Sequence, residues 1–220
     1  MAAVLCAAML VGVGCARFDA AQIEPFTTET EMRARPTTSP PPPPPLPPQP
    51  FPKQCKATGV MQGCLDATSG LIMLPDSQSA LVAERLTGAI KEVAVRAEPK
   101  VKTVIPVDPS GDGGLMDIVL SPTYTQDRLM YAYISTPTDN RVVRIANADP
   151  PKPILTGIPK GATGNTGSLI FTSPTTLVVQ TGDAGNPAAA ADPASMAGKV
   201  LRIEQPTTVN QAPVTTALSG

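Results

Sequence analysis

Three aspartates, Asp112, Asp117 and Asp183, are the side chains best suited to accept a proton from a substrate. They lie in glycine-rich turns or near the start of an apolar strand, so a β fold would bring them towards one end of its strands. A buried aspartate with a raised pKa can act as a general base. The alternative is that these carboxylates accept hydrogen bonds from turn amides, a common use of aspartate.

Histidine is absent from all 220 residues. This composition excludes a Ser-His-Asp triad, a Cys-His pair and any metal site with histidine ligands. Asp183 and Asn186 offer oxygen atoms of the kind that bind calcium, but two residues are too few for a site. Serine and threonine are plentiful, yet none has a basic partner that would activate it. We therefore predict no metal site and no catalysis of the triad type.

The N-terminal residues indicate export. Residues 2–14 are an uncharged apolar run, too short to span a bilayer, and end at Cys15. The junction resembles the lipobox of bacterial lipoproteins, in which the cysteine is lipidated. We predict a lipoprotein signal peptide over residues 1–14 and a membrane anchor at Cys15, with the exported chain on the cell membrane or surface. A cleaved secretion signal and a plain hydrophobic N-terminus remain alternatives.

Residues 15–54 predict an anchored stalk. Residues 40–45 are an unbroken proline run, and prolines continue to Pro52, which favours an extended polyproline II spacer. A ligand for an aromatic groove is the other reading of this segment. Cys55 and Cys64 follow, and in an exported chain they predict a local disulfide rather than a metal pair. The net charge of −1 gives no sign of a nucleic-acid partner.

Residues 55–220 carry a pattern of three short apolar strands that recurs three times. The expected strands are 71–74, 80–84 and 89–93, then 116–120, 129–134 and 141–145, then 168–172, 177–180 and 199–203. Prolines 75, 122 and 174 close the first strand of each unit, so the repeats are 122 − 75 = 47 and 174 − 122 = 52 residues long. Repeats of roughly this length are typical of β-propeller blades. We predict an all-β fold with about three blades, since a β-sandwich would not produce three matching units.

Five motifs in this region resemble, in order, those of the soluble quinoprotein sugar dehydrogenases, the glucose/sorbosone dehydrogenase family. They lie at residues 83–90, 113–122, 154–159, 181–186 and 198–203. The resemblance covers about residues 70–205 and implies a six-bladed β-propeller that holds pyrroloquinoline quinone (PQQ) and calcium on one end of the ring. With the lipobox and the stalk, the chain resembles a mycobacterial lipoprotein of this family.

The resemblance places Gly164 where the family has a histidine that takes the proton of a sugar hydroxyl as hydride moves to PQQ. In the surrounding loop Asn165 and Gly167 keep the family pattern, while Thr166 and Ser168 depart from it. Asp112 stands at a polar cofactor contact, where a carboxylate cannot donate a hydrogen bond to quinone oxygens. We therefore predict no catalytic residue, and PQQ and calcium are implied by the resemblance only.

The glycine at position 164 favours a non-catalytic propeller over an enzyme. Together with the N-terminal signal, it predicts an exported, lipid-anchored binding protein. Its loop face would bind a carbohydrate or protein ligand. The candidate ligand-binding residues are Asp112, Asp117, Asn165, Asp183 and Asn186. The alternative is a PQQ-dependent sugar dehydrogenase with altered catalytic residues, so enzymatic activity is left open. Because a ring needs about 4–8 blades, we also expect the chain to be a truncated propeller. Its open blade edges then predict self-association, up to two chains pairing into a six-bladed ring.

Overall fold

The protein is described by a computed structural model that covers residues 59–95, 97–146 and 149–206. The predicted signal peptide, the lipidation site Cys15, the stalk and Cys55 lie outside these residues. Cys64 is described and is disulfide-bonded. No helix in the described part is long and apolar enough to cross a membrane.

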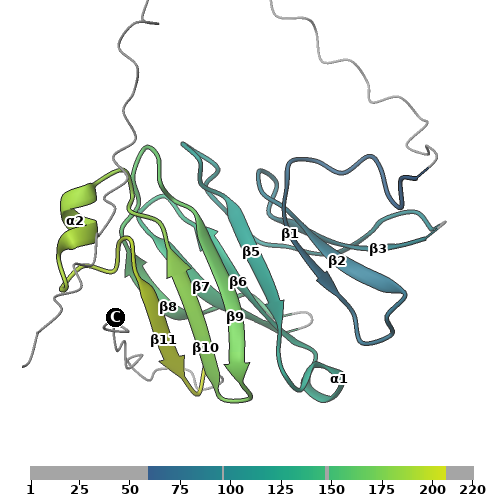
Figure 1. Ribbon diagram of the computed structural model, residues 1–220. Coiled ribbons are helices and arrows are strands. Elements are labelled where there is room, and N and C mark those ends of the chain that lie inside the picture. The colour runs from purple at the N-terminus through teal and green to yellow at the C-terminus, as the bar shows by residue number, and fades with distance from the viewer. Residues whose placement is uncertain (1–58, 96, 147–148, 207–220) are drawn as a thin grey trace, which may run out of the picture. The chain divides into compact units, whose positions relative to one another are not determined.

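The strands form three antiparallel sheets, and each sheet follows the order of the chain as a meander (Figure 1). Blade 1 contains β1 (Thr68–Met73), β2 (Ser79–Glu84), β3 (Ala89–Ala94) and β4 (Lys100–Val104). Blade 2 contains β5 (Leu115–Leu120), β6 (Leu129–Ser135), β7 (Asn140–Ala146) and β8 (Lys152–Ile158). Blade 3 contains β9 (Gly167–Ser173), β10 (Thr176–Thr181) and β11 (Val200–Glu204). The nine strands expected from the repeats are all present, with ends within three residues.

The repeat pattern missed β4 and β8, the outermost strands of blades 1 and 2. β4 is exposed over most of its length and carries Lys100 and Lys102. Pro153 is the second residue of β8. Lysine and proline are typical of edge strands, and they hide the apolar alternation by which a strand is recognised. The pattern also missed the short helix α1 (Tyr124–Asp127), and a second short helix, α2 (Pro187–Ala191), lies between β10 and β11.

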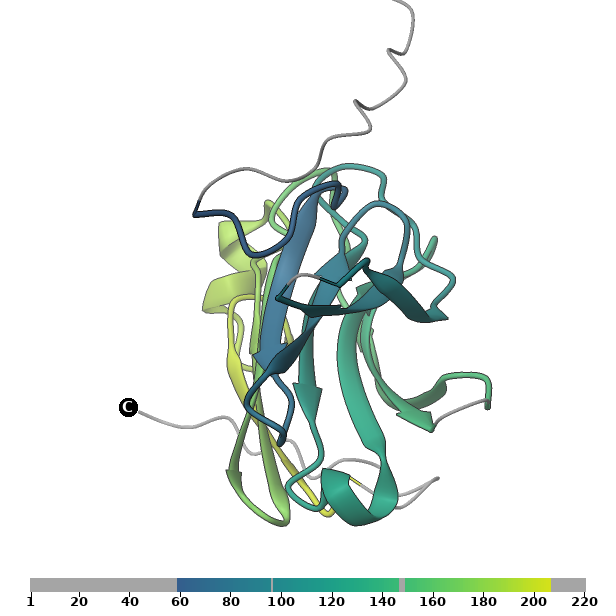
Figure 2. The same cartoon turned by 90° about the vertical axis from the view of Figure 1, so that its right-hand side faces the viewer.

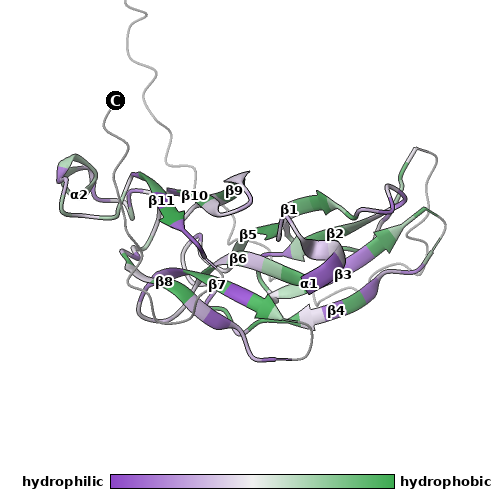
Figure 3. Cartoon of the chain, turned by 90° about the horizontal axis from the view of Figure 1, so that it is seen from below, coloured by the Kyte–Doolittle hydropathy of each residue, from purple (hydrophilic) through white to green (hydrophobic). Residues whose placement is uncertain are grey.

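The hydrophobic core lies between the blades, and β6 contributes to both of its halves. Met130, Ala132 and Ile134 pack in the cluster shared with blade 1. Tyr131 and Tyr133, which are fully buried, pack in the cluster shared with blade 3. This explains why β6 lacks polar alternation: both of its faces are covered. The sheets and their apolar segments are seen from one end in Figure 3.

The innermost strands β1, β5 and β9 lie side by side (Figures 1 and 2) and are joined by side-chain hydrogen bonds. Ser69 Oγ on β1 donates to the Leu115 carbonyl on β5 at 2.5 Å. Asp117 on β5 accepts from the backbone N–H of Leu169 on β9 at 2.7 Å. These bonds fix the three strands relative to one another. The loops that precede β5 and β9 therefore meet at one end of the blades.

Candidate functional site

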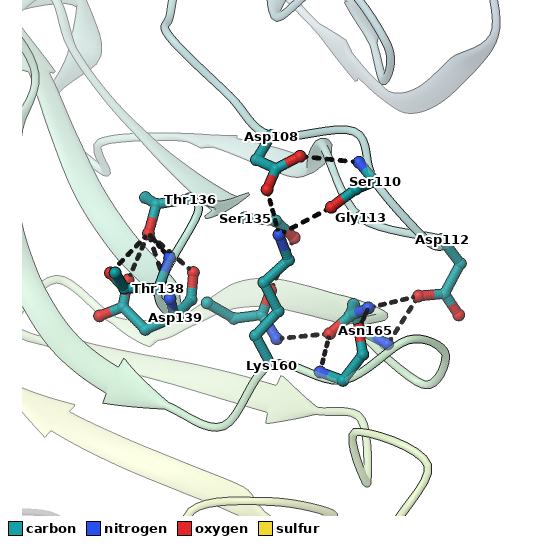
Figure 4. Close-up of polar contacts among 12 residues, drawn as sticks. Asp108, Ser110, Asp112, Gly113, Ser135, Thr136, Thr138, Asp139, Lys160 and Asn165 are labelled. Carbon is teal, nitrogen blue, oxygen red and sulfur yellow. Dashed lines mark hydrogen bonds and ion pairs between the residues drawn. The ribbon is translucent and has the colours of Figure 1, made fainter.

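The two loops that meet are residues 105–114, before β5, and residues 159–166, before β9. Asp112 of the first loop accepts three hydrogen bonds from the second, and Figure 4 shows the two that come from Asn165. Gly164 N lies 2.7 Å from Asp112 Oδ2, and Asn165 N and Nδ2 lie 3.0 and 2.8 Å from Oδ1. One carboxylate therefore holds the backbone of the loop in which the family pattern was recognised.

Asn165 is buried, and its side-chain amide is fully used inside the protein. Its Oδ1 accepts from Gly161 N at 2.9 Å and from Asn140 Nδ2 at 3.1 Å. Its Nδ2 donates to Asp112 and to the Gly161 carbonyl, both at 2.8 Å. An amide with both donors and both acceptor positions engaged keeps the loop in shape and has no hydrogen bond left for a ligand.

Lys160, on the same loop, was not identified from the sequence. Its ammonium lies 2.5 Å from Asp108 Oδ2 and 3.1 Å from Ser110 Oγ, and its side chain is 9% exposed (Figure 4). The hydrogen bond from Lys160 lowers the pKa of Asp108 to about 2. Lys160 and Asp108 are 52 positions apart, so no local pattern in the sequence links them. The sequence showed only that Lys160 is a cation in a loop that contains proline and glycine.

Gly164 has a left-handed backbone, with φ of +71°, and its surroundings leave no room for a side chain. A Cβ atom there would collide with Asp183 Oδ1 and would lie 2.6 Å from Gly185 N. The loop is bound to this turn, because Ala184 N donates to the Gly164 carbonyl at 2.9 Å. The position at which the resemblance predicts a histidine is therefore built for glycine.

The structure brings Asp112, Asn165 and Asp183 together around Gly164. Asp183 Oδ1 accepts from Gly185 N at 2.9 Å, which is the turn-stabilising use of aspartate. Asn186 is the N-cap of α2 and accepts from Ala189 N at 3.3 Å, so it is not part of the cluster.

Asp117 is separate from the cluster, since it lies within β5 and joins β9. Its Oδ1 accepts from Ile118 N at 2.8 Å and its Oδ2 from Leu169 N at 2.7 Å. Burial raises the pKa of Asp117, and these amide hydrogen bonds oppose the shift. A raised pKa was the sequence criterion for a base, but both carboxylate oxygens here are held by backbone amides.

The pKa of Asp112 moves in the other direction. Burial alone would raise it, but the hydrogen bonds from the amides of Asn165 and Gly164 outweigh burial and lower the pKa. Asp112 is therefore a firmly ionised carboxylate and a weak base at neutral pH. In the part of the chain that the structure describes, no three His, Cys, Asp or Glu side chains come together as a metal site.

The chain is similar in sequence to one protein family and in structure to several solved proteins. A sequence model described as Glucose / Sorbosone dehydrogenase matches residues 65–217. The PQQ-bound aldose sugar dehydrogenase of Streptomyces coelicolor is 33% identical, with a TM-score of 0.60 over 64% of this chain and 46% of that one. A Thermus thermophilus protein assigned as a glucose dehydrogenase is 28% identical, with the same TM-score over 68% and 46%. No curated protein sequence matches the chain.

These structures confirm the predicted fold class. The chain spans about half the length of the solved structures that it matches. The soluble aldose sugar dehydrogenase of Escherichia coli, at 24% identity and a TM-score of 0.58, supports the fold alone. The three blades thus correspond to part of a β-propeller, and within the described residues they do not close into a ring.

Proposed function

The chain belongs to the glucose/sorbosone dehydrogenase family, and from this premise we propose that it is an exported, lipid-anchored propeller protein that binds a ligand without oxidising it. The observation that carries the proposal is the environment of Gly164. The family's histidine position is occupied by a glycine whose neighbours exclude a Cβ atom. No histidine elsewhere in the chain can replace it.

The residues of this chain do not fit PQQ. PQQ is a tricarboxylic acid, and Asp112, which is ionised, stands at the cofactor-contact position implied by the resemblance. Its oxygens already accept hydrogen bonds from Gly164 and Asn165, and it has no donor to offer. Like charges repel each other, so the ionised Asp112 disfavours an anionic cofactor. We assign no reaction step to PQQ or to calcium.

The loop face instead suits a neutral, hydroxyl-bearing ligand such as a carbohydrate, or a polar segment of a protein. Asp183 accepts one hydrogen bond from the protein, through Oδ1, and is partly exposed beside Gly164. Carboxylate oxygens accept strong hydrogen bonds from hydroxyl groups. Asp183 would therefore contact the ligand, while Asp112 and Asn165 would hold the loop.

The test is binding measured separately from oxidation. The purified chain is titrated with glucose and other aldoses by calorimetry, and dye reduction is followed with PQQ and calcium added. We expect no dye reduction, and we expect any sugar binding to weaken in Asp183→Asn. Sugar-dependent dye reduction would favour the alternative, a PQQ-dependent dehydrogenase with altered catalytic residues.

Anchoring at Cys15 is a separate part of the proposal and rests on the lipobox-like junction alone. In a bacterial host that processes lipoproteins, the full chain should partition into the membrane fraction. Cys15→Ser should release it, whereas Cys6→Ser should not. A chain that is soluble before the substitution would contradict lipidation but leave the ligand-binding proposal untouched.

A further inference from the structure

A polar cleft of about 170 Å³ lies between blades 1 and 2, away from the loop cluster. Its lining residues are Lys102, Thr103, Tyr124, Arg128 and Met130. The loop cluster precedes β5, whereas α1 follows it (Figure 1). Because Tyr124 of α1 lines the cleft, the cleft lies at the opposite end of this strand from the loop cluster. The cleft is formed entirely by residues of this chain and plays no part in the proposed function.

Arg128 provides a guanidinium that stacks on an aromatic ring at this cleft. Its Cζ lies 5.5 Å from the centre of the Tyr124 ring, and the group forms no hydrogen bond or ion pair with any described residue. The neighbouring carboxylate of Asp127 is engaged elsewhere, by Ser121 Oγ at 2.6 Å and Leu129 N at 2.9 Å. Among the described residues, the guanidinium is therefore oriented by the ring alone and has hydrogen-bond donors left for an anion.

Tyr124 supplies a second, independent feature. The residue is 5% exposed and lines the cleft, yet its hydroxyl bonds to none of the described residues. The Tyr124 hydroxyl is not among the buried polar atoms that lack a partner in the described residues, so it reaches solvent in the cleft. The Tyr124 hydroxyl and the Arg128 guanidinium thus both offer hydrogen-bond donors to the same small space.

Arg128 also has an unusual backbone conformation for a long side chain. Arg128 is the C-cap of α1, with φ of 56° and ψ of 22°, a left-handed position that glycine favours. The residue that occupies it is a long cationic side chain at the mouth of a cleft. Lys102 lies on the other wall, and its ammonium is 3.2 Å from Glu92 Oε2 on the exposed surface.

We propose that this cleft binds a phosphate group. Arg128 donates to two phosphate oxygens, the Tyr124 hydroxyl donates to another, and Lys102 supplies the second positive charge. Glu92 competes with the phosphate for Lys102. The phosphate belongs to a small molecule such as a sugar phosphate, to free phosphate or to a lipid headgroup, three sources that the experiment separates.

The experiment titrates the full chain with inorganic phosphate, glucose 6-phosphate and vesicles of phosphatidylglycerol in phosphatidylcholine. The key variant is Arg128→Gly, because glycine suits the left-handed backbone and the fold is kept. We expect it to weaken binding at least about tenfold, the usual effect of losing charge-assisted hydrogen bonds. Glu92→Gln should strengthen binding by removing the competitor. Lys100→Ala, an exposed lysine on the same strand but outside the cleft, is the matched control.

Binding of any one probe that Arg128→Gly abolishes supports the cleft and identifies the source of the phosphate. Tyr124→Phe should weaken that binding to a smaller extent. The proposal is overturned if no probe binds at millimolar concentration, or if Arg128→Gly and Lys100→Ala bind alike.

Discussion

Asp112 Oδ2 accepts a hydrogen bond from Gly164 N at 2.7 Å. The resemblance implies that Asp112 stands at a cofactor-contact position and Gly164 at a histidine position, and these two residues are bonded directly to each other. In this chain both positions serve the loop itself. A change at either residue should therefore first lower the free energy of unfolding.

Asp112→Ala should destabilise the protein. The substitution leaves the amides of Gly164 and Asn165 and the Asn165 side chain without their acceptor. Losing hydrogen bonds to a charged group costs about 2 kcal/mol. Chemical denaturation should show that loss in the free energy of unfolding. Asp149→Ala, at an exposed aspartate, should change it by less than about 0.5 kcal/mol. Equal stability of the two variants would show that Asp112 does not hold the loop.

Gly164→His should fail to restore dehydrogenase activity and should destabilise the fold by about 2 kcal/mol or more. The reason is the collision of any Cβ atom with Asp183 and Gly185. Gly164→Ala separates the collision from the imidazole and should cost nearly as much. Gly59→Ala is the control, because Gly59 is also left-handed, at φ of +81°, but has nothing within 4 Å of its Cβ position. A stable Gly164→His variant that reduces dye with sugar and PQQ would refute the proposed function.

The sequence predicted the repeats well because each inner strand is apolar and ends close to a proline. It also indicated that Asp112 and Asp183 lie in turns and Asn165 in a loop, positions that a β fold can bring towards one end of its strands. A strand that packs between two blades needs apolar residues on both faces, whichever residues the neighbouring blades contribute. The uninterrupted apolar run of β6 is therefore enough to predict that this strand is buried.

The sequence did not indicate what these polar groups do once they meet. The bond between Lys160 and Asp108 spans 52 positions and depends on how two blades pack. The complete use of the Asn165 amide likewise depends on Asn140, 25 positions away. Local patterns carry no information on such pairs, because their geometry is set by tertiary packing. The lack of room for a side chain at Gly164 could not be predicted either, because it depends on Asp183 and Gly185, which are distant in the sequence.

Acid should weaken the link between Asp108 and Lys160 only at low pH. The pKa of Asp108 is lowered to about 2 by its hydrogen bond from Lys160, against an ordinary value of about 3.9 in an unfolded chain. Its contribution to stability is therefore fully present above about pH 4 and is lost as the pH falls towards 2. Thermal unfolding of Asp108→Asn should show a shallower decrease over this window than the unsubstituted protein. Identical pH profiles would rule out a stabilising role for the pair.

Glu84, in one of the family-like motifs, should have a structural role. It is 2% exposed, and its Oε1 lies 2.6 Å from Lys91 Nζ and 2.8 Å from Asp66 N. Burial by itself raises the pKa of Glu84, but these bonds outweigh it and lower the pKa. Glu84→Ala should cost about 3 kcal/mol in the free energy of unfolding, because it leaves a partly buried cation unpaired. Breaking the exposed pair of Lys102 by Glu92→Ala should cost less than about 1 kcal/mol.

The apolar outer face of blade 1 should make the chain self-associate. A groove of about 370 Å³ lies there, lined by Leu71 and Met73, which are 69% and 51% exposed. Exposed apolar side chains grouped on one sheet face favour packing against another surface. Sedimentation velocity should show a concentration-dependent dimer, and the double variant Leu71→Ser, Met73→Ser should shift it to monomer.

A substitution on the outer face of blade 3 distinguishes between two possible arrangements of that dimer. Ile170 is 58% exposed there. If blade 1 of one copy packs on blade 3 of the other, as ring closure requires, Ile170→Ser should weaken the dimer as the double variant does. If two copies of blade 1 pack on each other, Ile170→Ser should have no effect and the six-bladed pairing is wrong. Leu86→Ser, which lies outside the groove, is the control for lost apolar surface. A chain that stays monomeric at all concentrations would contradict both arrangements.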